Sequence, residues 1–292
     1  MGDANLKPEA RCLKPTWDLR SQKISSGQGP LSQGGPFFVG ILNVTPDSFS
    51  DGGRFLAPER ALAQALRLAA SGAAMFDVGA ESTRPGATAV SPMEEWARLA
   101  PVLEILRERL PGLPLSLDTR HAEVAAKGLD ACVSVLNDVA GFSDSAMLDL
   151  ARHSDCGLIA MRSRVRDGAL WMPDYGITTA CVADEAVREL QAVRDRLLDQ
   201  GVAPDRILLD PGFGFGMTFG EDLALWRSLP RLPELLSWPV EQFCIGVSRK
   251  RFLAWRNGTP ELPPQERDGL TAVAHSEAAA MGYRVFRTHE LP

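Results

Sequence analysis

Polar side chains suited to binding a ligand follow directly on the first apolar stretch of the chain. Residues 37–42 read as a buried strand. The run from Asn43 to Gly53 then brings an amide, two acids, three hydroxyls and an aromatic ring, closed by a pair of glycines. A strand that only serves the core would end in a plain turn, whereas α/β enzymes carry their chemistry just past the carboxyl ends of strands. The run therefore predicts part of an active site.

The elements that would position this run recur along the rest of the chain. Apolar strand patterns alternate with helical patterns, which indicates parallel strands joined by right-handed crossovers. Eight strands over about 250 residues predict a (β/α)8 barrel, with a doubly wound open sheet as the alternative. The predicted strands are 37–42, 75–79, 114–117, 133–136, 157–161, 206–210, 243–247 and 284–288, and the predicted helices lie near 58–71, 92–109, 121–128, 144–153, 179–200, 221–229 and 268–281.

Nearly every predicted strand ends in an acid, an amide or a cation. In a parallel barrel these ends meet at one rim, so we expect the groups to share a site rather than only to cap the helices that follow. Acids and an amide suit the donor-rich edge of an aminopyrimidine or pterin ring, and cations suit a ring carbonyl or a phosphate. The groups are Asn43, Glu81 to Gly86, Asp118, Asn137 with Asp138, Met161 with Arg162, Asp210, Ser248 with Arg249 and Lys250, and Arg287 with His289.

Several separated motifs between Phe37 and His289 resemble, in their order, the signature of the dihydropteroate synthase family. They are Asn43 to Gly53, Glu81 to Gly86, Asp118-Thr119, Asn137-Asp138, Asp210 to Gly216, Ser248-Arg249-Lys250 and Arg287-Thr288-His289. Members of the family are (β/α)8 barrels and the targets of sulfonamides. They join p-aminobenzoate to 6-hydroxymethyl-7,8-dihydropterin pyrophosphate in folate synthesis, use Mg²⁺ and release pyrophosphate. The resemblance implies the same fold, transferase reaction and cofactor for this chain.

The resemblance also implies roles for individual residues. Asp47, Lys250 and Arg287 would be the catalytic groups, with Asp47 stabilising the cation that forms on the pterin methylene as pyrophosphate leaves. Asn43 would be the metal ligand. The binding groups would be Asp118, Asn137, Met161, Asp210, Gly214, Phe215 and Lys250 for the pterin, Asn43, Thr83, Arg287 and His289 for pyrophosphate, and Phe49, Thr83, Arg84, Pro85 and Phe215 for p-aminobenzoate.

Two segments depart from the family pattern. After the fifth strand the family usually has a Met-His-Met run where this chain has Met161-Arg162-Ser163, and the usual lysine after the glycine-phenylalanine loop is Met217. We expect Arg162 to point to the rim, because arginine is costly to bury unpaired. The departures leave two alternatives open: a divergent non-catalytic paralogue that binds a pterin or a protein partner, and a pterin-dependent methyltransferase barrel.

Composition narrows the class of protein further. The formal net charge of -6 argues against a nucleic-acid partner, and no stretch reads as a membrane span or signal peptide. The cysteines include no Cys-x-x-Cys pair, and we expect the reducing cytosol as the compartment. Residues 1–36 read as a poorly ordered extension before a barrel domain at 37–292. No helical pattern follows the last predicted strand, so we expect a homodimer to cover the barrel there, with the extension as the alternative cover.

Overall fold

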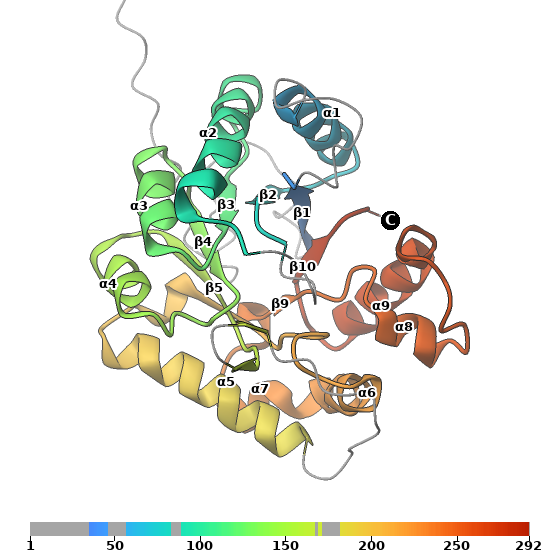
Figure 1. The fold of residues 1–292 in the computed structure, drawn as a ribbon. Helices are drawn as coiled ribbons and strands as arrows, with labels where there is room; N and C mark the ends of the chain where they lie inside the picture. The colour runs from blue at the N-terminus through green and yellow to red at the C-terminus, as the bar shows by residue number, and fades with distance from the viewer. Residues whose placement is uncertain (1–34, 46–56, 83–88, 167–168, 171–181, 292) are drawn as a thin grey trace, which may run out of the picture.

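The structure is a computed structural model that describes residues 35–45, 57–82, 89–166, 169–170 and 182–291. Within these ranges, parallel strands form a ring that helices surround (Figure 1). Five of the predicted site residues lie outside the described residues: Asp47, Phe49, Thr83, Arg84 and Pro85. The same holds for most of the predicted extension at 1–36.

The strands pair in the manner of a barrel. The eight-stranded sheet has the order β8-β5-β4-β3-β2-β1-β10-β9, and all of its pairs are parallel. A bridge between Leu209 and Phe243 links the two ends of this order, so the barrel is nearly closed and the prediction of a (β/α)8 barrel is confirmed. The strands are β1 (Phe37–Asn43), β2 (Met75–Gly79), β3 (Leu115–Asp118), β4 (Val135–Asp138), β5 (Gly157–Met161), β8 (Ile207–Asp210), β9 (Cys244–Ile245) and β10 (Val285–Thr288).

The helices form an outer layer around the strands (Figure 1). Every predicted helical pattern corresponds to a helix. Two short helices and a short antiparallel hairpin were not predicted, since such segments are too brief to show a period. The helices are α1 (Ala57–Ala70), α2 (Pro92–Arg109), α3 (Ala122–Asp130), α4 (Ser145–His153), α5 (Val182–Asp199), α6 (Phe219–Ser228), α7 (Leu232–Leu236), α8 (Arg251–Arg256) and α9 (Asp268–Ala280), and the hairpin is β6 (Val165–Arg166) with β7 (Ala169–Leu170).

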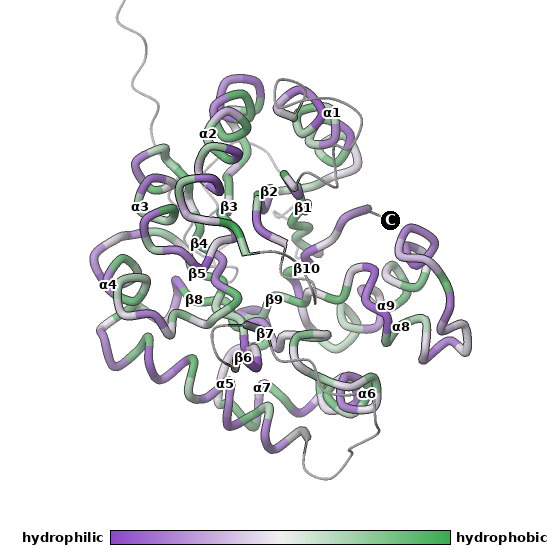
Figure 2. Tube along the Cα trace, viewed as in Figure 1, coloured by the Kyte–Doolittle hydropathy of each residue, from purple (hydrophilic) through white to green (hydrophobic). Residues whose placement is uncertain are grey.

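The strand interiors change from apolar to polar along their length. Side chains on one face of a strand recur every second residue. One small buried apolar cluster includes Met75, Val135, Leu208 and Val285, each on a different strand, and a larger cluster joins the strands to the helices. Hydrophilic and hydrophobic residues accordingly alternate along the outer helices (Figure 2). On each of these four strands, the residue two positions further toward the carboxyl end is polar. These residues are Asp77, Asn137, Asp210 and Arg287.

The described chain after β10 lies against the first helix. Glu290 forms an ion pair with Arg67 of α1, and Leu291 is buried. No helix follows β10 within the part of the chain that the structure describes. Among these residues there is also no helix with the length and apolar character that a bilayer crossing requires.

Candidate active site

A network of charged and amide groups lies at the carboxyl ends of β2, β3, β4 and β10. The Asp77 carboxylate is fully buried, and its Oδ2 accepts hydrogen bonds from Asn137 Nδ2 at 2.9 Å and from Arg287 Nε at 2.5 Å. The same guanidinium donates through Nη2 to Asp118 Oδ2 at 2.5 Å. One arginine therefore links two carboxylates from different strands. Three predicted residues, Asp118, Asn137 and Arg287, are brought together around an acid that was not predicted.

Burial and charge act on this network in opposite directions. Burial raises the pKa of Asp118; Arg287 opposes that rise, while the neighbouring Asp77 adds to it. Burial by itself lowers the pKa of Arg287, but the two carboxylates outweigh burial and raise it. The guanidinium therefore stays charged at every physiological pH. Asp118 is the more exposed of the two acids, at 19% against 0% for Asp77.

Asp210 ends β8 and is almost completely buried. Its Oδ1 accepts the backbone N–H of Gly212 at 2.8 Å, which fixes the turn after the strand. Burial raises the pKa of this carboxyl to about 6, although the Gly212 hydrogen bond and the charges of Arg287 and Lys250 lower it in part. Asp210 therefore caps the turn after its strand through Oδ1. The other oxygen of the same carboxylate, Oδ2, remains available to accept a hydrogen bond from a ligand.

The loop after β8 packs against Lys250 from the segment after β9. Lys250 Nζ lies 3.9 Å from the centre of the Phe215 ring, which is a cation–π contact. The Gly214 N–H donates to Asp222 Oδ1 at 2.7 Å. Gly214 has a φ of +75°, and an added Cβ would lie only 3.0 Å from Lys250 Cδ. The glycine lets the lysine pass close to the loop, so three predicted pterin-binding residues, Gly214, Phe215 and Lys250, lie together.

Ser248 and Lys250 point toward different neighbours of β9. The Ser248 hydroxyl lies 3.0 Å from His289 Nδ1 and accepts the His289 N–H at 3.1 Å, after β10, while Lys250 turns to the loop after β8. Arg249 between them has a φ of +58°, a costly conformation for a residue with a side chain. Asp268 holds its guanidinium with hydrogen bonds of 2.7 and 2.8 Å. Arg249 therefore has a structural partner in α9.

The remaining described candidates stand at strand ends. Met161 is buried at the end of β5, and Asn43 is half-buried at the end of β1. Among the described residues no group of three or more His, Cys, Asp or Glu side chains could hold a metal ion. Asp138, named with Asn137 in the sequence, caps its own turn, since its two oxygens accept the N–H groups of Ala140 and Phe142 at 2.8 and 2.7 Å.

The prediction that Arg162 points to the rim is wrong. Its side chain is 1% exposed, and its Nε is paired with the Glu189 carboxylate of α5. Its Nη1 donates to the Pro211 carbonyl at 3.2 Å and approaches Met217 Sδ at 3.4 Å. The cost of burying an arginine is real, but the sequence pattern could not reveal that a glutamate on the following helix lies within reach to offset it.

Two acids that lie among these groups, Asp77 and Asp222, were missed, and Glu81 was named only as the start of a motif. Asp77 interrupts an otherwise apolar strand, a signal that was available in the sequence. Asp222, in α6, holds Gly214, and burial raises its pKa to about 7. Glu81, after β2, pairs bidentately with Arg120 at 2.9 and 3.0 Å and accepts the Val90 N–H at 3.2 Å. Glu81 therefore ties the chain at Val90 back to the end of β2.

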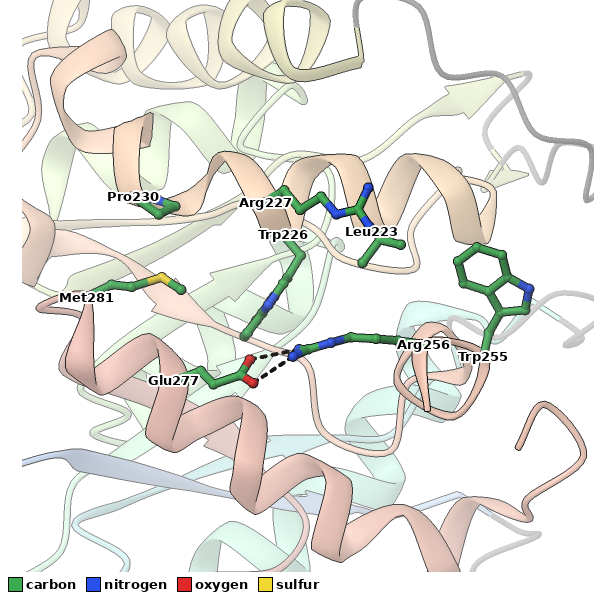
Figure 3. A pocket seen from close by; sticks show the side chains of 8 residues that line it. All are labelled: Leu223, Trp226, Arg227, Pro230, Trp255, Arg256, Glu277 and Met281. Atoms are coloured by element: carbon green, nitrogen blue, oxygen red, sulfur yellow. Dashed lines mark hydrogen bonds and ion pairs between the residues drawn. The ribbon is translucent and has the colours of Figure 1, made fainter. Parts of the chain in front are cut away.

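A pocket of about 580 Å³ lies in the outer helical layer (Figure 3). Arg256 and Glu277 form a bidentate ion pair across it, with hydrogen bonds of 2.7 and 2.6 Å. None of its lining residues is a predicted site residue. They are Leu223, Trp226, Arg227, Pro230, Trp255, Arg256, Glu277 and Met281.

Known proteins resemble the chain over nearly all of the barrel. The family described as pterin binding enzyme matches residues 39–289. A dihydropteroate synthase from Neisseria meningitidis serogroup C is 38% identical over 260 residues, which cover 88% of each chain. The structure of Xanthomonas albilineans dihydropteroate synthase with 4-aminobenzoic acid has a TM-score of 0.75 at 38% identity and covers 88% of both chains.

A third relative was solved with a pterin. The structure of dihydropteroate synthase from Anaplasma phagocytophilum with bound 6-hydroxymethylpterin-monophosphate has a TM-score of 0.75 at 35% identity, and the match covers 87% of this chain and 94% of that one. Identity of this extent over nearly the whole barrel, together with the matching family pattern, establishes kinship. The chain belongs to the pterin binding enzyme family and, within it, to the dihydropteroate synthases.

Proposed function

We propose that this protein is a dihydropteroate synthase whose pterin pocket is formed by Asp118, Asn137, Asp210 and Lys250. It condenses 6-hydroxymethyl-7,8-dihydropterin pyrophosphate with p-aminobenzoate and gives 7,8-dihydropteroate and pyrophosphate. The single observation that carries the proposal is the meeting of two rim carboxylates, Asp118 and Asp210, with an amide and a lysine at the carboxyl ends of the strands. Such a set matches the donors and the carbonyl of a pterin edge.

The depth of these groups supports the assignment. Asn137 and Asp210 are 4% and 5% exposed, so a ring that reached them would be shielded from water. A buried carboxylate that accepts two ring N–H groups fixes the plane of the ring and its distance from the leaving group. Met161 at the end of β5 and Phe215 in the loop after β8 are apolar, and we infer that they line the pocket.

The leaving group would lie between the ends of β1 and β10. Asn43 and His289 stand there. Arg287 of β10 is paired with Asp77 and Asp118, and we propose that its guanidinium also faces the pyrophosphate. The amide oxygen of Asn43 suits Mg²⁺, which proteins commonly hold through one or two oxygens together with phosphate and water. Bound magnesium would supply neutralisation of the charge that grows on pyrophosphate. For five residues outside the described ranges we propose roles only: Asp47 stabilises the developing cation, Thr83 binds pyrophosphate, and Phe49, Thr83, Arg84 and Pro85 bind p-aminobenzoate.

The aryl amine of p-aminobenzoate is a weak nucleophile, so departure of pyrophosphate has to supply most of the driving force. The protein's part is to hold the two substrates in line and to stabilise the charge on the leaving group. No covalent intermediate with the protein is needed. The acids around the pterin can stabilise the positive charge that develops on its methylene carbon.

Turnover by the purified full-length chain tests the proposal. The protein is mixed with the pterin pyrophosphate, p-aminobenzoate and Mg²⁺, and 7,8-dihydropteroate and pyrophosphate are measured in equal amounts. A protein that binds the pterin but forms no product would be the non-catalytic paralogue instead. Methyl transfer from a folate without use of p-aminobenzoate would favour the methyltransferase alternative. The homodimer and the cytosolic compartment stay predictions, for which size measurements and cell fractionation are the tests.

A further inference from the structure

A set of buried and half-buried charges lies outside the candidate pocket, next to the loop that carries Gly214 and Phe215. We call it the arginine–glutamate network: Arg162, Arg164, Glu185, Glu189 and Glu221. Glu189 of α5 contacts both arginines, through Oε2 to Arg162 Nε and through Oε1 to Arg164 Nε at 3.6 Å. Arg164 also pairs with Glu185 at 2.8 Å and with Glu221 at 3.0 Å. The network thus links α5 to the start of α6.

The two arginines also hold the loop at both of its ends. We call residues 211–217 the glycine loop. Arg162 Nη1 donates to the Pro211 carbonyl and Arg164 Nη1 donates to the Gly216 carbonyl, both at 3.2 Å. The backbone joins in, because the Arg162 N–H donates to the Asp210 carbonyl at 3.0 Å.

Close packing leaves the loop little room to shift. Gly212 has a φ of +71°, and an added Cβ would lie only 1.8 Å from the Arg162 carbonyl oxygen. The buried side of the loop therefore rests directly on the backbone of Arg162. The loop's other face carries Phe215 against Lys250, where the pterin is proposed to bind. A shift at Pro211 or Gly216 would move Phe215 relative to that lysine.

Because Arg162 is buried, the loss of any of its contacts should destabilise the protein. A guanidinium at 1% exposure is stable only with its carboxylate partner, since an unpaired buried charge is strongly destabilising. If the arginines moved away, the carbonyls of Pro211 and Gly216 would lose their charged donors, and hydrogen bonds from charged donors are stronger than those from neutral ones. The positions of the two arginines and the conformation of the glycine loop therefore depend on each other.

We infer that Arg162 and Arg164 are positioning residues that hold the glycine loop in the conformation in which Phe215 and Lys250 receive the pterin. They do so from outside the pocket, through the Pro211 and Gly216 carbonyls. This inference rests on the proposed function for the identity of the ligand. Its claim about the loop itself stands on the contacts alone.

Arg164→Gln is the variant of choice, because its side chain is 15% exposed and its loss is easier to tolerate than that of Arg162. Arg206→Gln is the matched control. Arg206 also holds two carbonyls, those of Cys156 and Ala151 at 2.8 Å each, but it does so at the amino end of β8, below the barrel core. If both variants lose stability to the same extent, that loss comes from removing an arginine that donates to backbone carbonyls, and not from the glycine loop in particular.

Two readouts are compared in the full-length variants. The first is the dissociation constant for 6-hydroxymethylpterin monophosphate, which we expect to rise about tenfold in Arg164→Gln and to change less than about twofold in Arg206→Gln. The second is amide hydrogen exchange of residues 212–217, which we expect to become faster in Arg164→Gln alone. Restoring a cation with Arg164→Lys should recover part of the affinity.

An unchanged dissociation constant and unchanged exchange in Arg164→Gln, at a lowered melting temperature, would overturn the inference and leave the network a purely stabilising one. Failure of the wild-type protein to bind the pterin would count against the proposed function instead. In that case the exchange of residues 212–217 still decides whether the network positions the loop.

Discussion

Arg287 and Asp77 are 210 residues apart in the chain, yet Arg287 Nε donates to Asp77 Oδ2 at 2.5 Å inside the barrel. The contact spans β10 and β2, which flank β1. It joins the last strand of the barrel to the second and brings the guanidinium to Asp118 as well. Asp77 is thereby a structural partner of two proposed site residues, and its loss should be felt in both stability and binding.

We expect Asp77→Ala to lower the free energy of unfolding by about 3–5 kcal/mol, because it leaves the charge of Arg287 with one carboxylate fewer and Asn137 without its acceptor. Urea unfolding followed by circular dichroism measures the change. Asp184→Ala, at an exposed position of α5, is the control and should stay within about 0.5 kcal/mol of the wild type. A similar small effect for Asp77→Ala would mean that the buried pair contributes nothing to stability.

Asp210→Ala should abolish measurable pterin binding while the protein stays folded. Ring donors that reach the site would lose their acceptor, at a cost of about 1–3 kcal/mol or more. Calorimetry with 6-hydroxymethylpterin monophosphate measures the affinity. Asp138→Ala is the matched control, since it removes another buried carboxylate that caps a turn. Wild-type affinity in the Asp210 variant would remove this residue from the pocket.

The pKa of Asp210, raised by burial to about 6, predicts how binding and stability depend on pH. The ionised carboxylate is the better acceptor, so the dissociation constant of the pterin should rise about tenfold for each pH unit below that pKa. The stability of the unliganded protein changes with pH in the opposite direction. Its carboxyl binds a proton more readily folded than unfolded, so this group's contribution to stability is fully present below about pH 4 and is lost as the pH rises through about 6.

Calorimetry from about pH 5 to 8 and urea unfolding over the same range separate these two trends. In Asp210→Asn both pH dependences should become shallower, since the group no longer titrates. A pterin affinity that is level over this range in the wild type would show that the ring does not depend on this carboxylate.

Arg162 and Met217 both depart from the family pattern, and their side chains touch, at 3.4 Å between Nη1 and Sδ. Arg162→His should destabilise the protein because it leaves Glu189 without a firm cation and empties part of a packed site. Met217→Lys should also destabilise it, since an ammonium would then be buried next to a guanidinium. The double variant carries one cation in the same place, and we expect it to recover roughly 1–3 kcal/mol relative to the sum of the single effects.

Urea unfolding of the four proteins gives this coupling energy directly. Met217→Leu serves as the control for a change of shape without charge. Strictly additive effects would show that the two positions do not compensate each other, despite their contact.

Arg249→Ala should impair catalysis more than stability. The left-handed backbone at Arg249 separates the directions of Ser248 and Lys250, and Asp268 holds it through the guanidinium. Without that clamp we expect kcat/KM to fall about tenfold or more. Asp268→Asn should give a smaller change in the same direction, because one of its two acceptors remains. Arg256→Ala, which breaks a comparable bidentate pair with Glu277 in the outer layer, is the control and should leave kcat/KM unchanged.

Local pattern was enough for the architecture and for the positions of most site residues. Alternation of apolar runs and helical periods is a property of neighbouring residues, so all eight barrel strands could be predicted to within a few residues. Strand ends are equally local, and parallel strands must bring their ends to one rim. Asp118, Asn137 and Asp210 could therefore be predicted to stand at one rim of the barrel without knowledge of their partners.

The tertiary structure alone decided which of these groups pair and which are buried. Arg287 was predicted to bind pyrophosphate, which stays a prediction, and the sequence did not show that the barrel would pair it with Asp77 and Asp118 from distant parts of the chain. Arg162 was expected at the rim, but Glu189 on the next helix makes its burial possible. A sequence assigns a side chain to a strand end or to a helix face. The charge beside it depends on how elements far apart in the chain pack, and that is determined only when the barrel closes.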